Sequence, residues 1–146
     1  MIALIRGEKD ASDKAVILHG HTDTVGVEDF GKLDPYAFDC DKLLNKMLDM
    51  DLPEEVYQDL STGKWMVGRG SCDMKSGVAV FLVLLKILSE KADKLKGNIL
   101  LSINPVEENL HTGIIEGLAI LEMLKEKENF KYKFAINNDY ICPLYK

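Results

Sequence analysis

Two histidines and an aspartate follow a short apolar run near the N-terminus of the chain. The run at residues 16–18 is typical of a buried strand, and His19, His21 and Asp23 come directly after it. Ligands of open α/β sheets bind just beyond the carboxyl ends of strands. In an extended chain His21 and Asp23 face the same side, so the carboxylate can hold one imidazole nitrogen while the other binds a metal. These residues alone predict either a metal ligand or a solvated, hydrogen-bonded strand end.

Acidic residues recur at the same position of the predicted architecture. Asp73 lies in the turn before a predicted helix, Glu107 and Glu108 follow a predicted strand, and Asp139 follows the last predicted strand. Such loops of a parallel sheet open at one edge, and carboxylates gathered there repel one another unless cations neutralise them. Histidine with carboxylates suits zinc, or alternatively cobalt or manganese. A carboxylate shared by two metals is the usual design of a two-metal hydrolytic site, in which one of two adjacent glutamates can accept a proton from water.

The stretch 68–76, G-R-G-S-C-D-M-K-S, allows a different interpretation as a phosphate-binding loop. The Walker pattern requires glycine immediately before the Lys-Ser pair, and Met74 occupies that place. The predicted strand before it, at residues 64–67, is also short. We therefore keep a nucleotide-binding domain only as a third alternative.

Strands that alternate with helices must position these side chains. The predicted strands are 2–5, 15–18, 64–67, 99–103 and 134–136, and the predicted helices are 41–50, 53–60, 76–92 and 112–127. This order implies an α/β fold with a mainly parallel sheet and helices on both faces. The first half of the helix at 76–92 is apolar nearly all round, as expected in the middle of a domain. Residues 26–63 are predicted to form an insertion over one edge of the sheet.

Composition narrows the class of protein. A chain of 146 residues has room for one domain. The formal net charge of -6 argues against a nucleic-acid or anionic-membrane partner. No apolar run is long enough to span a bilayer, and three cysteines without a CxxC spacing favour a reducing compartment. We expect a soluble, cytoplasmic protein that acts on a small molecule.

Three motifs in order along the chain resemble one family of co-catalytic zinc enzymes. They are G-H-T-D-T-V at 20–25, G-R-G-S-C-D-M-K-S-G at 68–77 and N-P-V-E-E at 104–108. The family includes acetylornithine deacetylase, succinyl-diaminopimelate desuccinylase, aminoacylase and glutamate carboxypeptidase. Within it, A-I-N-N-D-Y at 135–140 and the long 26–63 segment most resemble predicted deacylases of arginine utilisation.

The resemblance implies two zinc ions and a ligand set for them. His21 would bind one zinc together with Asp139, Asp73 would bridge both ions, and Glu108 would bind the second. The peptide bond after Asp73 is often cis in this family. The fold implied is that of a zinc-exopeptidase catalytic domain.

The resemblance also assigns two catalytic residues. Glu107 would be the general base that activates water, and Asp23 would orient His21. His19 is expected to point away from His21 and to have a structural role.

Two family features are missing from this chain. The last zinc ligand of the family is a histidine far downstream, and His111, just after the glutamate pair, does not fit that role. The lid domain that usually mediates dimerisation is absent as well. We expect residues 1–146 to form a partial catalytic domain that is inactive alone and belongs to a homodimeric protein.

The combined prediction is metal-dependent hydrolysis of an amide bond in a small N-acyl amino acid or peptide. The alternative is a non-catalytic binding or regulatory protein that has kept the fold.

Overall fold

The computed structural model describes residues 1–10 and 12–140, and within them four strands form one sheet in the order β1-β3-β2-β4. The strands are β1 (Ile2–Ile5), β2 (Lys14–His21), β3 (Asn98–Asn104) and β4 (Lys131–Asn137). β2 is parallel to both β3 and β4, whereas β1 is antiparallel to β3. The prediction of a mainly parallel sheet is therefore confirmed.

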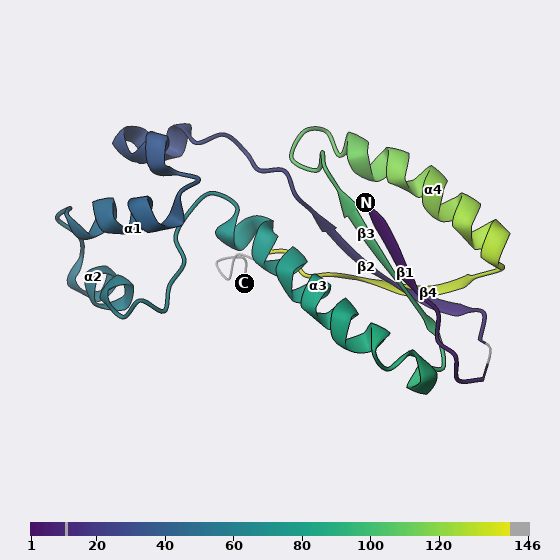
Figure 1. Ribbon diagram of the computed structural model, residues 1–146. Coiled ribbons are helices and arrows are strands. Elements are labelled where there is room, and N and C mark those ends of the chain that lie inside the picture. Colours follow the sequence, from purple (N-terminus) through teal and green to yellow (C-terminus); the bar gives the residue numbers. More distant parts are fainter. Residues whose placement is uncertain (11, 141–146) are drawn as a thin grey trace, which may run out of the picture.

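Two long helices cover opposite faces of this sheet (Figure 1). Helix α3 (Ser76–Ser89) places Val78 and Phe81 in one apolar cluster with Leu101. Helix α4 (Thr112–Glu128) packs Leu121 against a second cluster that contains Leu100. Leu100 and Leu101 pack on opposite faces of the sheet because successive strand residues point to opposite faces. The prediction of helices on both faces is confirmed.

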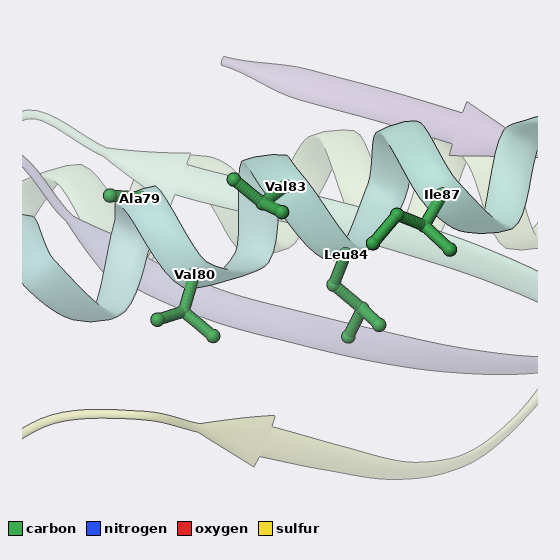
Figure 2. A pocket seen from close by; sticks show the side chains of 5 residues that line it. All are labelled: Ala79, Val80, Val83, Leu84 and Ile87. Carbon is green, nitrogen blue, oxygen red and sulfur yellow. The ribbon is translucent and has the colours of Figure 1, made fainter.

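The outer face of α3 is exposed in the described part of the chain, contrary to the expectation of a helix buried all round. Val80, Val83, Leu84 and Ile87 project side by side with Ala79 from the side of α3 that is turned away from the core (Figure 2). The helix also ends at Ser89, and a short 3-10 turn, η3 (Ala92–Lys94), follows it. No helix in the described residues is both long and apolar enough to cross a membrane.

The segment between β2 and α3 extends away from the sheet (Figure 1). It contains η1 (Glu28–Tyr36), α1 (Cys40–Leu48) and α2 (Glu54–Ser61). Asp39 caps α1 by accepting the main-chain N–H of Lys42. The predicted strand at 64–67 is wrong, because these residues form no regular element. Trp65 and Met66 are exposed, and no neighbouring strand pairs with them in the described residues.

The three parallel strands end at one edge of the sheet. β2 continues three residues beyond the predicted end, so that His21 lies beside Asn104 of β3. His19 of β2 lies beside Asn137, the last residue of β4. The loops that follow these strands therefore open together, as the parallel arrangement requires.

Candidate metal centre

His21 is the buried centre of the site, with 1% of its surface exposed. Its Nδ1 lies 3.2 Å from the main-chain oxygen of Asp23 and 3.4 Å from Oδ1 of the same residue. Both of these partners are acceptors, so Nδ1 carries the ring proton. The other ring nitrogen, Nε2, lies on the opposite side of the ring and is directed away from Asp23.

Three carboxylates from three other segments face this Nε2. Asp73 Oδ1 lies 3.2 Å away, Asp139 Oδ2 3.5 Å away and Glu107 Oε2 4.0 Å away. Asp73 belongs to η2 (Ser71–Lys75), a kinked turn before α3, while Glu107 and Asp139 follow β3 and β4. The structure thus brings together side chains that are far apart in the sequence.

The possible ligand atoms form two overlapping groups, in each of which all atoms lie within 4.8 Å of one another. One group consists of His21, Asp73 and Asp139, and the other of His21, Glu107 and Glu108. All four residues that the sequence analysis expected to bind metal occur in these groups. Neutral imidazole with several carboxylates is a donor set that zinc and manganese accept.

Asp23 joins the end of β2 to the glutamate pair. Its carboxylate accepts the main-chain N–H groups of Glu107, at 2.9 and 3.0 Å, and of Glu108, at 3.0 Å. Burial raises the pKa of Asp23, but these hydrogen bonds outweigh it, and the pKa lies below its ordinary value. Asp23 therefore stays ionised and fixes both His21 and the loop that carries the glutamates.

In the described part of the chain, the facing carboxylates are not neutralised by lysine or arginine. Burial first, and then the charge of Asp139, raises the pKa of Asp73, and burial followed by the charge of Asp73 raises the pKa of Glu108. Among the described residues, no lysine or arginine forms an ion pair with Asp73, Glu107, Glu108 or Asp139. A cation placed between His21 Nε2 and these oxygens would relieve the repulsion, so the residues present fit a metal ion.

Close packing holds Asp73 and Asp139 near His21. The side chain of Met74 is fully buried, and its Sδ accepts the main-chain N–H of His21 at 3.2 Å. A Cβ on Gly20 would lie 2.9 Å from Met74 Cε, and one on Gly77 would lie 2.2 Å from the carbonyl oxygen of Asn138. Glycine at position 77 therefore lets the first turn of α3 touch the end of β4. The Asp73–Met74 peptide bond is cis, as the family resemblance implies.

Three residues at the site were not assigned a role from the sequence. Lys75 Nζ donates to the carbonyl oxygen of Thr22 at 2.6 Å, so it ties η2 to the end of β2. Asn104, within the third motif, donates from Nδ2 to His19 Nε2 at 2.9 Å. His111 Nδ1 lies 3.1 Å from Glu107 Oε1. The motif itself contains Lys75 and Asn104, whereas only the four-residue spacing from Glu107 could have pointed to His111.

The expected direction of His19 was wrong. Because β2 continues through His21, the two histidines lie two residues apart on one strand and face the same side of the sheet. The hydrogen bond with Asn104 occupies Nε2 of His19. His19 is also absent from both groups of possible ligands.

The chain belongs to peptidase family M20/M25/M40, whose family model matches residues 17–142. It is 45% identical, over 99% of its length, to protein RocB of Bacillus subtilis (strain 168). It is 33% identical, over 85% of its length, to the uncharacterized protein YqjN of the same organism. No solved structure matches the chain.

These relatives are much longer than the chain. The aligned region covers 25% of RocB and 23% of YqjN. Membership of a peptidase family supports a hydrolase role for the protein. It also agrees with the group of possible metal ligands at the strand ends.

Proposed function

We propose that this chain provides the metal-binding part of a hydrolase that cleaves the amide bond of a small N-acyl amino acid or short peptide. One observation carries the proposal: Nε2 of buried His21 faces the carboxylates of Asp73, Asp139 and Glu107. A role in arginine utilisation, a cytoplasmic location and a homodimeric state belong to the same proposal and rest on the family resemblance. The assignment of residues 1–146 as a partial catalytic domain stays a prediction.

Two zinc ions are the proposed cofactors, with cobalt or manganese as alternatives. His21, Asp73 and Asp139 would hold one ion, and Glu108 would bind the other, with Asp73 as a ligand that both would share. When bound, the ions would polarise the scissile carbonyl and lower the pKa of water. Asp23 supports this arrangement because it fixes the His21 tautomer and thereby keeps Nε2 available.

Glu107 is the proposed general base. Its carboxylate belongs to one of the two groups of possible ligands, with Oε2 4.0 Å from His21 Nε2, and 23% of the side chain is exposed. From this place Glu107 can take a proton from water and later deliver it to the leaving amine. Both glutamates occur in one group of possible ligands, and Asp23 fixes the main chain of both. The proposal takes Glu108 as the ligand and Glu107 as the base because the family resemblance implies these roles.

The test uses the complete natural polypeptide that carries this sequence, loaded with zinc, against a panel of N-acetyl amino acids and dipeptides. We expect Glu107→Gln to abolish hydrolysis while zinc stoichiometry stays unchanged. The matched control is Glu122→Gln, which alters an exposed glutamate of α4 and should retain activity. Loss of zinc together with activity would show that Glu107 is a ligand instead of the base.

The alternative is a binding or regulatory protein that has kept the fold. A zinc-loaded protein that binds an N-acyl amino acid, measured by calorimetry, without releasing any amine would favour this alternative. Heat on titration with a nucleotide would support the phosphate-loop interpretation of residues 68–76.

A further inference from the structure

The carboxylate of Glu107 has two differently placed oxygens. Oε2 is turned toward the ligand group, 4.0 Å from His21 Nε2, whereas Oε1 lies 3.1 Å from Nδ1 of His111. His111 is itself 64% exposed and belongs to neither group of possible ligands. Its ring therefore contacts the proposed base from the side opposite to the metal centre.

The main chain fixes His111 in this place. Its N–H donates to the carbonyl oxygen of Glu107 at 3.2 Å, and its own carbonyl oxygen accepts the N–H groups of Ile114 and Ile115 at the start of α4, both at 3.1 Å. His111 and Leu110 both have left-handed backbone conformations, with φ of 54° and 60°. Such conformations are unfavourable for residues other than glycine and persist only where surrounding contacts fix them.

We infer that His111 is a positioning residue for Glu107, in that its Nδ1–H donates to Oε1 and thereby turns Oε2 toward the metal centre. A carboxylate on a loop can otherwise rotate about its last bond and present either oxygen. A hydrogen bond to one oxygen removes this freedom and leaves the other oxygen for the reaction. The inference rests on the proposed function, because it takes Glu107 as the general base.

The first experiment needs neither metal nor substrate. Long-range ¹H–¹⁵N spectra of the metal-free chain at alkaline pH distinguish the two neutral tautomers of each histidine. We expect His111 to show the Nδ1–H tautomer and to lose it in Glu107→Ala, but not in the control Glu122→Ala. A His111 ring in the Nε2–H form, unaffected by Glu107→Ala, would overturn the inference.

The second experiment measures kcat and KM separately in the zinc-loaded complete polypeptide, with the N-acetyl amino acid that the wild type hydrolyses. We expect His111→Ala to lower kcat about tenfold, with KM and zinc stoichiometry unchanged. His111→Asn, which keeps a side-chain N–H donor, should recover part of the rate. The control Leu110→Ala changes the adjacent exposed residue of the same loop and should retain the rate.

The two experiments distinguish a failure of the proposed function from a failure of the positioning role of His111. A wild type that hydrolyses nothing would contradict the proposed function, while the tautomer spectra would still test the contact. An active wild type with an equally active His111→Ala would overturn the positioning role. An equal loss of kcat in His111→Ala and His111→Asn would also overturn it, since the donor would then be irrelevant.

Discussion

Acidic side chains on the outer surface and those at the strand ends differ in what faces them. On the surface, Asp13 pairs with Lys131 and Asp39 pairs with Lys42, each at 2.7 Å. The hydrogen bond to the lysine is the largest cause that lowers the pKa of each of these aspartates. Each of these aspartates is already neutralised by its lysine, so neither favours binding of a further cation.

At the strand ends the situation is reversed. Asp73 and Glu108 face other carboxylates and one histidine, and their pKa values are raised by burial and by like charge. Exposed ion pairs contribute little to stability, whereas unneutralised carboxylates that converge on one point favour binding of a cation. The comparison teaches that it is not the number of acids in this chain that marks the candidate site, but the absence of lysine and arginine partners around a few of them in the described residues.

The largest expected effect comes from removing one of the converging carboxylates. Asp73→Asn should weaken zinc binding by more than about 100-fold, because loss of a direct ligand costs more than loss of a group that only orients one. Isothermal titration of the chain with zinc measures this. Asp13→Asn is the matched surface control and should bind zinc as the wild type does. Equal affinities of the two variants would remove the distinction between the two kinds of acid.

A smaller effect is expected from Asp23, which orients other residues. Asp23→Ala leaves the N–H groups of Glu107 and Glu108 without their acceptor, so it should lower the free energy of unfolding by about 1–3 kcal/mol. It should also weaken zinc binding by about 10–100-fold. Urea denaturation and calorimetry measure the two quantities. A wild-type zinc affinity in this variant would show that His21 needs no orienting partner.

The smallest effect concerns pH in the metal-free chain. The pKa of Asp73 in the folded chain lies above the ordinary value of 3.8, so its contribution to stability is present below that pH and is lost as the pH rises through the folded pKa. The stability of the wild type relative to Asp73→Asn should therefore fall as the pH rises above 3.8. Denaturation of both proteins at several pH values measures this difference.

Zinc should reverse the direction of this pH dependence. With zinc present, ionised Asp73 is the form that binds, so the wild type should gain stability relative to Asp73→Asn as the pH rises. If the stability difference between the wild type and Asp73→Asn did not change with pH, with or without zinc, the neighbouring charges would have no effect on the pKa of Asp73.

Much of the fold and the site could be predicted from local pattern. The apolar runs that become β1, β2 and β3 are short and bounded by turn residues, and each formed a strand close to its predicted place. His21, Asp73, Glu107, Glu108 and Asp139 could be singled out because each follows or precedes such an element. The parallel order of the strands then required their loops to meet at one edge.

Two of the failures have a common physical cause, whereas the direction of His19 was a local error, because alternation along a strand already places residues 19 and 21 on one side. The strand expected at 64–67 needed a neighbour to pair with. The exposed face of α3 depends on which other elements cover it. None of these quantities is a property of the segment alone, since pairing, register and burial are decided by residues distant in the sequence.

The sequence by itself determined which residues are candidates for the chemistry, because their types and their places at strand ends are local features. Only the tertiary structure decided how they face one another: Met74 lies against Gly20, Asp23 holds the main chain of both glutamates, and His111 lies beside one oxygen of Glu107. These contacts depend on how the loops after β2 and β3 are placed against each other. That placement comes from the side-chain contacts by which α3 and α4 pack on the sheet, and no local pattern specifies these contacts.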